Sequence, residues 1–372
     1  MTDGYTEAAP GRLLPLTNGW EAFIPNELPP QIDSAAVLST VFEAGQELGT
    51  LSSLSSEHAS EAVRKYLLHQ EAVATSQLEG LDVGLDTVYQ QTCGHSQLIP
   101  EHQRVDAETA ANWIQAFEYG RNNSLDSDSV DMLCGVHKKL LGGLHEEKKP
   151  GEVRQSQNYI GGLYGKPTYV PPPPHHVRPL LENVVEFTND DTSYPAVVTA
   201  ALAHYQFEAI HPFLDGNGRT GRIWLVISLI NAGILEKTVL PVSVYLNTHR
   251  STYTDLLLQV SQEGTWEEWL EFLLTAISEQ ARATQRVIRV LSESIQEDSA
   301  AYSGRSCMSM VVEAAYKKPY FSVEQMVSET DKSYPAVNRA VAALSEKGVL
   351  TEVTGNDRNR VFRANWLDEY LL

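Results

Sequence analysis

Twelve consecutive residues, HPFLDGNGRTGR at 211–222, bring together the side chains that phosphate chemistry requires. The glycine-rich run at 216–218 lies directly before an apolar segment that predicts a helix over 219–232. A glycine-rich loop that opens a helix places several N–H groups and the positive end of the helix dipole at one point. This stretch therefore predicts an anion cradle that suits phosphate.

The charged side chains of this stretch favour a polyphosphate. Arg219 and Arg222 are three residues apart, so both project near the first helical turn, where two guanidiniums can form forked hydrogen bonds. Asp215 would be repelled by phosphates unless a cation lay between them, which indicates Mg²⁺. His211 can accept a proton from a nucleophile near neutral pH. Each feature alone is commonly structural, but their combination within twelve residues favours a functional site.

The segments that position this stretch predict a mainly α fold, with an all-helical core, a short β-hairpin flap and a C-terminal winged helix. Residues 1–35 show no clear period and are interpreted as an irregular arm. The run QNYIGGLYGKPTYV predicts the hairpin at 158–170, and the four prolines at 171–174 predict an extended end to it. The pattern turns helical from about residue 36, and further helical patterns are expected at 60–81, 107–118, 128–144, 195–209, 219–232, 250–262 and 266–295.

The C-terminal part differs in charge from the rest of the chain. Residues 305–372 carry nine Lys and Arg and nine Asp and Glu, so the remainder carries the whole net charge of −20. A polar stretch at 292–305 predicts a linker before this part. The predicted order is three helices and a strand–turn–strand, which is a winged-helix arrangement; the expected elements are 308–316, 322–329, 334–347, 350–354 and 360–364.

Composition restricts the class of protein. The chain has 372 residues, with 28 basic and 48 acidic side chains, which argues against wholesale binding of nucleic acid or of an anionic membrane. The three cysteines, Cys93, Cys134 and Cys307, are too scattered for a disulfide framework or a zinc site, and a cytoplasmic location fits that count. The N-terminus does not resemble a signal peptide, and the most apolar stretch, 223–235, is too short to span a bilayer.

The stretch HPFLDGNGRTGR matches the signature H-x-F-x-[D/E]-G-N-G-R-x-x-R of the Fic family, and the chain resembles that family from about residue 40 to 280. Most Fic proteins transfer AMP from ATP to a hydroxyl of a target protein. The resemblance implies that His211 deprotonates the Ser, Thr or Tyr hydroxyl and that Asp215 holds Mg²⁺. The remaining phosphate ligands implied by the family are Gly216, Asn217 and Gly218 at the α-phosphate, and Arg219 and Arg222 at the β- and γ-phosphates.

A second motif, TSQLEG at 75–80, resembles the inhibitory pattern [S/T]-x-x-x-E-[G/N] of the same family. Thr75 and Glu79 are four residues apart on one face of the expected helix, and Gly80 stands where a helix cap is expected. The resemblance implies that Glu79 pairs with Arg222 and so occupies the γ-phosphate position. Alone, the motif is an ordinary helix end.

Other positions leave alternatives open. The flap residues Tyr159, Ile160, Gly161 and Gly162 either pair with an extended target segment or only cover the cleft. Tyr253 lies in a run that resembles a downstream family pattern and could line an adenine pocket, although packing in the core is the usual role of such an aromatic. His204 is interpreted as a core residue.

The winged-helix prediction raises a second class of function, a nucleotide-sensing DNA-binding regulator. Candidate DNA contacts are Ser333, Tyr334, Asn338, Arg339, Lys347, Arg358, Arg360 and Arg363. The segment lacks net positive charge, which favours protein contacts over DNA. Family members often dimerise, and some remove AMP, so a homodimer and the reverse reaction are further expectations. The predicted division of the chain is 1–35, 36–125, 126–298 and 305–372.

Overall fold

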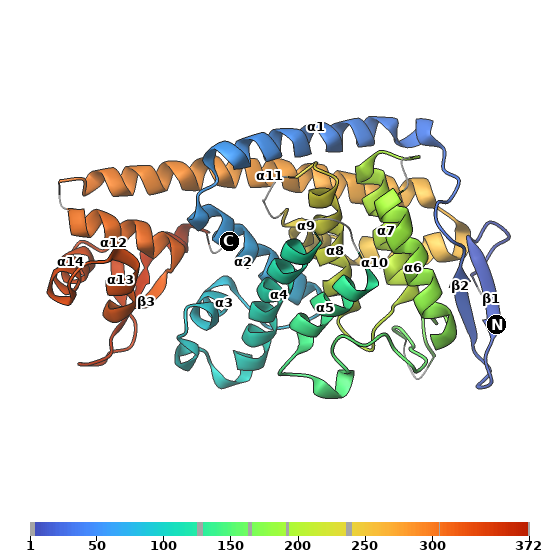
Figure 1. Ribbon diagram of the computed structural model, residues 1–372, viewed down its shortest axis with the longest axis horizontal. Coiled ribbons are helices and arrows are strands. Elements are labelled where there is room, and N and C mark those ends of the chain that lie inside the picture. The colour runs from blue at the N-terminus through green and yellow to red at the C-terminus, as the bar shows by residue number, and fades with distance from the viewer. Residues whose placement is uncertain are drawn as a thin grey trace. The chain divides into compact units, whose positions relative to one another are not determined.

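The computed structural model describes residues 4–124, 129–162, 166–190, 193–235, 240–304 and 306–370. The fold is mainly helical with small sheets, as predicted (Figure 1). The chain divides into two compact units: the first unit comprises residues 1–53 and 112–282, and the second unit comprises residues 54–111 and 283–372. In the described ranges, no helix is both long enough and apolar enough to cross a bilayer.

The first unit holds the 211–222 stretch. Part of α1 (Ser34–His58), α4 (Arg104–Asn123) and α11 (Trp266–Ala301) belongs to it, and the rest of each belongs to the second unit. The other helices of the first unit are α5 (Val130–Leu141), α6 (Pro174–Asp190), α7 (Ala196–Ile210), α8 (Asn217–Asn231), α9 (Val242–Thr248) and α10 (Arg250–Glu263).

The helices α7 and α8 form the core of the first unit, and α6 packs on α7 (Figure 1). Both α7 and α8 are buried on nearly all sides, as expected for helices that are apolar all round. The rings of Phe207 and Trp224 meet edge to face at 5.7 Å. A Cβ atom on Gly221 would lie 2.9 Å from the Phe207 ring, so the glycine permits the close approach of the two helices. This packing fixes the two ends of the loop between α7 and α8.

The N-terminal segment that was expected to be irregular contains a β-hairpin. Strand β1 (Gly11–Pro15) pairs antiparallel with β2 (Glu21–Pro25), and Leu13 lies opposite Phe23. The prediction of an irregular arm is therefore wrong for these residues. The pair Asn18-Gly19 between the strands is a strong turn signal, and it identifies the hairpin once the short strands are considered.

Three helices were not predicted, and one is longer than expected. Helix α6 begins at Pro174, because proline is well suited to the first position of a helix; only the preceding prolines are extended. The short helices α9 and α3 (Leu85–Thr92) were also not predicted, because they have too few residues to show a helical period. Helix α11 continues to Ala301, so most of the expected linker at 292–305 is helical.

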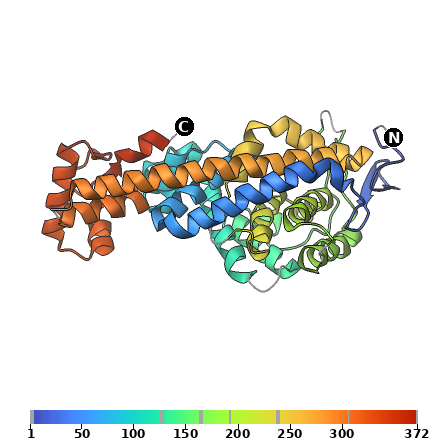
Figure 2. The same ribbon diagram turned by 90° about the horizontal axis from the view of Figure 1, so that it is seen from above.

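Figure 2 shows α1 running beside α11, and within the first unit the two helices are joined by charged side chains. Arg282 of α11 forms ion pairs with Glu43 and, at 3.2 Å, with Glu47 of α1. It also pairs with Glu279, one turn earlier in α11, at 2.9 Å. The long polar helices are thus attached by a cluster of charges.

The second unit contains the TSQLEG motif and the C-terminal part of the chain. Its remaining elements are α2 (Glu61–Leu78), α3, α12 (Ser306–Lys317), β3 (Tyr320–Ser322), α13 (Val323–Thr330), α14 (Tyr334–Glu346), β4 (Leu350–Glu352) and β5 (Val361–Ala364). The three strands form one antiparallel sheet in the order β3-β5-β4. The predicted strand–turn–strand is present, and β3 adds a strand that was not predicted. We call residues 306–370 the C-terminal module.

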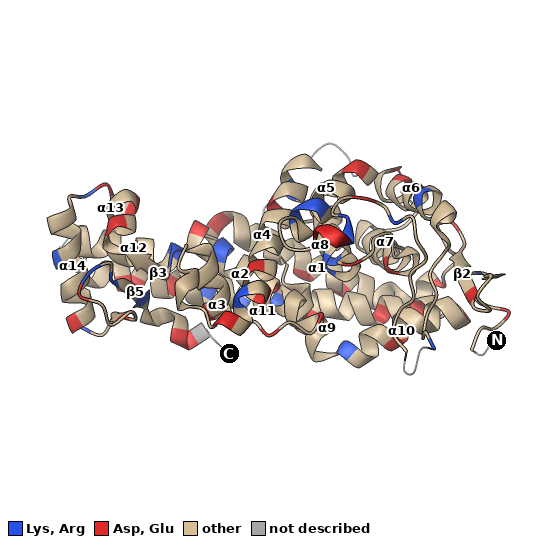
Figure 3. Ribbon diagram, turned by 90° about the horizontal axis from the view of Figure 1, so that it is seen from below, with Lys and Arg blue, Asp and Glu red and all other residues tan. Residues whose placement is uncertain are grey.

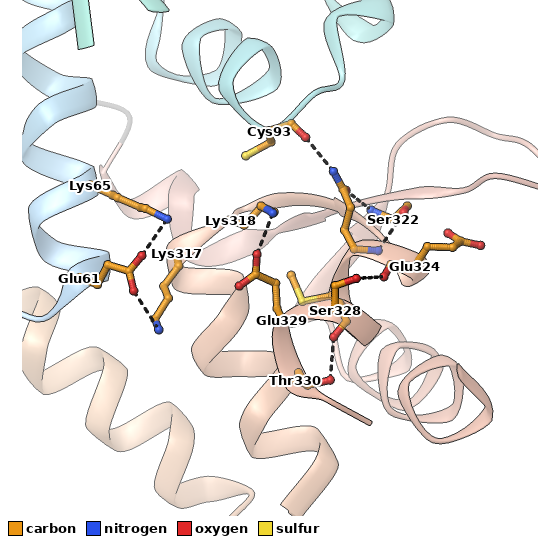
Figure 4. A network of polar contacts seen from close by, with 12 residues as sticks. Glu61, Lys65, Cys93, Lys317, Lys318, Ser322, Glu324, Ser328, Glu329 and Thr330 are labelled. Carbon is orange, nitrogen blue, oxygen red and sulfur yellow. Dashed lines mark hydrogen bonds and ion pairs between the residues drawn. The ribbon is translucent and has the colours of Figure 1, made fainter. Parts of the chain in front are cut away.

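Polar contacts attach the C-terminal module to α2 and to the end of α3. The Lys317 ammonium lies 3.2 Å from the Glu61 carboxylate, which also pairs with Lys65 at 3.0 Å (Figure 4). Gln325 donates a hydrogen bond of 2.9 Å to the carbonyl of Cys93, just after α3. These contacts join segments more than 200 positions apart in the sequence.

Asp86 of α3 is the second point of attachment. It accepts a hydrogen bond of 2.5 Å from the Tyr320 hydroxyl and one of 3.1 Å from Arg363 Nε. The ring of Trp366 lies edge-on to Tyr66 of α2, with centroids 6.5 Å apart. Arg363, a candidate DNA contact in the sequence, is therefore occupied by contacts inside the second unit.

Candidate functional site

The loop at 211–218, which we call the motif loop, begins where α7 ends. His211 adopts a left-handed conformation with φ of 51°, and its N–H still bonds to the Phe207 carbonyl at 2.9 Å. The following proline disfavours helical geometry at residue 211, so the helix must end there. Gly216, with φ of 73°, turns the chain into α8. The imidazole thus comes from a turn that is fixed on both sides by helices.

The N-terminus of α8 has the geometry of an anion site. Its first helical hydrogen bond runs from the Thr220 N–H to the Gly216 carbonyl, at 3.0 Å. The amides of residues 217–219 precede that bond, and such amides have no helical acceptor. Together with the helix dipole they attract a negative charge. The motif loop therefore ends at a helix N-terminus, as the sequence predicts, and phosphate binding there stays a prediction.

Asn217 supports the shape of the motif loop. Its side-chain oxygen accepts a hydrogen bond from the Phe213 N–H at 2.8 Å, and its amide nitrogen donates to the Phe213 carbonyl at 2.9 Å. Both polar groups of the side chain are thereby engaged with one residue. Any contact of Asn217 with phosphate would use its backbone N–H, so the side chain acts as a brace.

His137 of α5 braces the far end of the loop. Its Nδ1 accepts a hydrogen bond of 2.9 Å from the Gly151 N–H, so Nε2 carries the proton and donates to the Asp215 carbonyl, also at 2.9 Å. The imidazole stacks on the Phe213 ring at 3.9 Å. Burial lowers the pKa of His137 to about 4, so the ring stays neutral in this role near pH 7.

Two residues outside the motif hold the other carbonyls of the loop. Arg154 donates to the carbonyls of His211 and Ile210, at 2.8 and 3.2 Å. Asn158, at the start of the flap, donates to the Phe213 carbonyl at 2.8 Å. The carbonyls of His211, Phe213 and Asp215 are therefore held by side-chain donors, which fixes the path of the loop into α8.

The charged residues of the motif lie close together and are largely buried. Arg219 and Arg222 are 6% and 1% exposed, and Arg219 Nη2 lies 3.7 Å from Asp215 Oδ1. Burial lowers the pKa of His204 to about 3, and the positive charge of Arg222 adds to the effect. His204 is thus a neutral core residue that packs near Arg222, as interpreted from the sequence.

Asp215 is suited to share a cation with a ligand. Its side chain is 42% exposed, and its Oδ1 accepts a hydrogen bond of 2.6 Å from the Gly216 N–H. Among the residues that the structure describes, no three His, Cys, Asp or Glu side chains come together as a complete metal site. A single carboxylate fits Mg²⁺, which usually takes one or two carboxylates and completes its shell with substrate phosphates and water.

The described residues of the flap contain one isolated antiparallel bridge where a two-stranded hairpin was predicted; residues 163–165 lie outside the described residues. Ile160 pairs antiparallel with Tyr169, and Gly161 and Gly162 follow as exposed residues with positive φ. Tyr159 is 45% exposed, and its hydroxyl accepts a hydrogen bond of 2.5 Å from Asn18. The N-terminal hairpin also reaches the second leg of the flap, because the N–H of Phe23 bonds to the Val170 carbonyl at 2.9 Å.

Tyr253 occupies a core position. It is 4% exposed, and its hydroxyl bonds to Nε2 of His204 at 2.9 Å. Its ring lies 6.0 Å from that of Trp269. This environment supports the packing alternative, and the adenine-pocket role stays a prediction.

The TSQLEG motif ends α2 in the second unit. Thr75 is buried, while Glu79 is the exposed residue that follows the last helical position. Gly80 has φ of 86°, and the Leu81 N–H bonds back to the Ser76 carbonyl at 3.1 Å, which is a Schellman cap. The predicted glycine cap is thus confirmed, and the pairing of Glu79 with Arg222 stays a prediction.

Sequence reasoning missed the residues that hold the motif loop. His137, Arg154 and Asn158 lie 50 or more positions before the residues whose carbonyls they bind, and each is a common residue type in an unremarkable context. The sequence offered one hint, because Arg154 lies just before the flap pattern and Asn158 is its first residue. That signal does not reveal which carbonyls they reach.

Comparison with known proteins agrees with this geometry. Residues 127–229 match the sequence model of the Fic/DOC family, and residues 38–122 match that of the Fic/DOC family N-terminal region. The "Protein adenylyltransferase Fic" of Aedes aegypti is 31% identical over 178 residues, which cover 47% of this chain and 32% of the relative. The "Protein adenylyltransferase fic-1" of Caenorhabditis elegans is 31% identical over 137 residues, 35% of this chain and 25% of the relative. The chain thus spans about a third or less of the length of these curated relatives.

Solved structures share the fold. A Fic family protein from Desulfovibrio desulfuricans G20 superposes with a TM-score of 0.62 at 20% identity, covering 91% of this chain and 98% of that one. Fic-1 from Caenorhabditis elegans has a TM-score of 0.53 at 21% identity, covering 70% of this chain and 74% of that one. Taken with the two family matches, these likenesses identify a Fic/DOC domain, preceded by the N-terminal region of the same family, within this chain.

Proposed function

We propose that this chain is a protein adenylyltransferase that transfers AMP from ATP to a Ser, Thr or Tyr hydroxyl of a target protein and of itself. One observation carries the proposal. The motif loop, with its complete Fic signature, brings the N-terminus of α8 together with two buried arginines and the imidazole-bearing turn, an arrangement suited to binding phosphate. The curated relatives that carry the name protein adenylyltransferase support the same activity.

The proposed reaction uses the motif residues in distinct roles. His211 takes the proton of the target hydroxyl while its oxygen forms a bond to the α-phosphorus of ATP. The bond from that phosphorus to the bridging oxygen breaks, and pyrophosphate leaves. The amides of Asn217 and Gly218 hold the α-phosphate, next to Gly216, whose own N–H bonds to Asp215. Arg219 and Arg222 stabilise the charge on the β- and γ-phosphates. The protein mainly positions and neutralises the reactants in such a transfer.

Asp215 would hold Mg²⁺ in this reaction. Its carboxylate is partly exposed at the edge of the loop, which allows a cation to contact both it and a phosphate. The cation supplies neutralisation of phosphate charge. The 3.7 Å separation from Arg219 keeps the carboxylate beside a positive charge, which counters its repulsion of the phosphates.

The flap is proposed to align the target. Its first leg is attached to the motif loop through Asn158, so an extended segment that paired with the flap would lie in a fixed relation to His211. The attachment of Tyr159 to Asn18 gives the flap a second support. These contacts favour the alignment role over a simple cover.

Glu79 is proposed to inhibit the transfer by pairing with Arg222. The experiment that tests both activity and inhibition compares Glu79→Gly with the wild type, using ATP labelled at the α-phosphate and mass spectrometry of the products. We expect an added AMP on a hydroxyl residue and a higher yield in the variant, because Arg222 becomes available to the γ-phosphate. A matched control is Glu57→Gly, at an exposed position of α1. Equal yields from the variant and the wild type would contradict the inhibition, and no AMP on either protein or target would contradict the activity.

The C-terminal module is proposed to be a winged helix, on the basis of its three helices and its sheet of order β3-β5-β4. Figure 3 shows acidic and basic residues interleaved on this module. Before and along α14 and in the β4–β5 turn, exposed basic residues are mixed with acidic ones; the set is Asp331, Lys332, Arg339, Glu346, Lys347, Asp357, Arg358 and Arg360. Mixed charge favours contacts with protein over DNA.

A further inference from the structure

Arg154 has an unusual environment for a charged side chain. It is 1% exposed, and among the described residues its side chain donates only to main-chain carbonyl oxygens. A buried charge is unfavourable unless it is paired or fully hydrogen-bonded. Here the carbonyl dipoles replace a carboxylate partner. The charge of this buried arginine is therefore balanced by main-chain dipoles alone.

The carbonyls that Arg154 binds come from two parts of the site. Nε and Nη2 bind the carbonyls of His211 and Ile210, at the end of α7. Nη1 binds the Ser156 carbonyl at 3.0 Å, and Nη2 binds the Pro172 carbonyl at 2.6 Å. Residues 156 and 172 lie immediately outside the two legs of the flap. A single guanidinium thus joins the turn that carries the imidazole to both ends of the flap.

The backbone of Arg154 adds a fifth link, because its N–H bonds to the Pro212 carbonyl at 2.9 Å. Burial lowers the pKa of Arg154 to about 10, so the guanidinium keeps its charge at neutral pH. Its planar fork can bind carbonyls in several directions at once, whereas a lysine ammonium at the same place lacks that fixed geometry.

We propose that Arg154 is a positioning residue that fixes the His211 turn and the flap as one rigid element, so that the proton acceptor and the bound target hydroxyl stay aligned. This inference rests on the proposed function. Arg154 acts only through the main chain, and it contacts neither the phosphates nor the hydroxyl. Its loss should therefore lower turnover while the cradle at the start of α8 keeps its affinity for ATP.

The test measures self-modification with α-labelled ATP, in a Glu79→Gly parent that is free of the proposed inhibition. Arg154→Lys should lower turnover on the order of 10²-fold, which is the expected effect of a misplacement of about 1 Å, with an unchanged KM for ATP. The turnover of Arg154→Ala should be lower still. Millimolar guanidinium chloride should restore turnover in this variant, whereas sodium chloride at equal ionic strength should not. Arg178→Ala, which removes an exposed arginine of α6, is the matched control and should equal the parent.

A second readout separates this inference from the proposed function. Amide hydrogen exchange of the protein without ATP should speed up together in residues 210–216 and in the described parts of the flap in Arg154→Lys, and nowhere else in the first unit. If the parent transfers no AMP, the proposed function fails, and the exchange result alone decides the role of Arg154. Parent-like turnover in Arg154→Lys, a loss confined to ATP affinity, or exchange that changes in only one of the two segments overturns the inference.

Discussion

The motif loop of the first unit and the C-terminal module of the second unit are held in place by different kinds of contact. Buried side chains bind the loop through its main-chain carbonyls, and His137 and Arg154 are 0% and 1% exposed. Partly exposed charges attach the module: the side chains of Lys317 and Glu61 are 40% and 52% exposed. Salt screens exposed pairs but hardly affects buried hydrogen bonds. The loop is therefore built for a single geometry, whereas the attachment of the module depends on solution conditions.

The largest expected effect comes from removing the reactive group while its supports remain. His211→Ala should lower AMP transfer on the order of 10²–10⁴-fold, the usual contribution of a general base, because the loop carbonyls keep their donors. Binding of ATP, measured by calorimetry, should persist. Wild-type turnover in this variant would remove His211 from the role of base, and loss of ATP binding would show that its side chain supports the cradle.

Removing a support should instead affect stability. His137→Ala leaves the Asp215 carbonyl and the Gly151 N–H without their partner and opens a cavity against Phe213, so the free energy of unfolding should fall by about 2–4 kcal/mol. Urea denaturation of the variant measures the change. His58→Ala, at a position whose side chain is 54% exposed, is the control. A decrease no larger than that of the control would mean that the loop does not depend on this brace.

Low pH should lower the stability of both units to a similar extent, because each unit contains a buried histidine that is neutral in the folded protein. Burial lowers the pKa of His137 in the first unit and of His69 in the second unit to about 4. Each therefore binds a proton more readily after unfolding, where its pKa is about 6.5, so stability falls as the pH drops below that value. The loss should be about 2 kcal/mol for each histidine between pH 7 and pH 5.

Urea denaturation over that pH range measures this dependence. His69 bonds to the Lys65 carbonyl and to Thr92 and stacks on Tyr89, so His69→Gln retains part of the hydrogen bonding while removing the titration. The variant should show a flatter dependence on pH than the wild type. An unchanged slope would mean that the proton on His69 does not contribute.

The smallest effect is expected at the attachment of the C-terminal module. Asp86→Ala removes the acceptor of Tyr320 and Arg363 and should lower the stability of the second unit by about 1 kcal/mol at low salt, and by less at high salt. Hydrogen exchange in α3 and α12 reports the change. Asp357→Ala, at an exposed position of the β4–β5 turn, is the control. If the loss of stability did not depend on salt, buried hydrogen bonds would hold this module in place, as they hold the motif loop.

The same contrast explains how much the sequence could predict. The residues of the motif are contiguous, so the start of α8 after the glycines, the turn at His211 and the glycine cap at Gly80 could be predicted from a local stretch. Helices with a clear apolar period, such as α7 and α8, were equally accessible. Short elements such as α3, α9 and the N-terminal hairpin give too few residues for a period to stand out.

Other features depend on contacts between distant positions, and local patterns do not contain them. The pairing of Arg154 with the Ile210 carbonyl joins residues 56 positions apart, and that of Asp86 with Arg363 joins residues 277 apart. Helix α11 continues to Ala301 through a polar stretch, where the sequence alone suggested a linker. The Tyr316 hydroxyl, which bonds to Asp298 of this helix at 2.6 Å, shows that the polar residues have partners.

The second unit is built from two segments that are far apart in the sequence, 54–111 and 283–372, so the ribosome synthesises them at different times. Helix α2 is synthesised early, but α12, on which it packs, emerges only after the residues of the first unit are complete. At about 5–20 residues per second, the 95 residues from 223 to Lys317, where α12 ends, take roughly 5–19 s. During that interval a nascent chain already holds the whole HPFLDGNGRTGR motif, while α2, which Glu79 caps, still lacks its contact with α12.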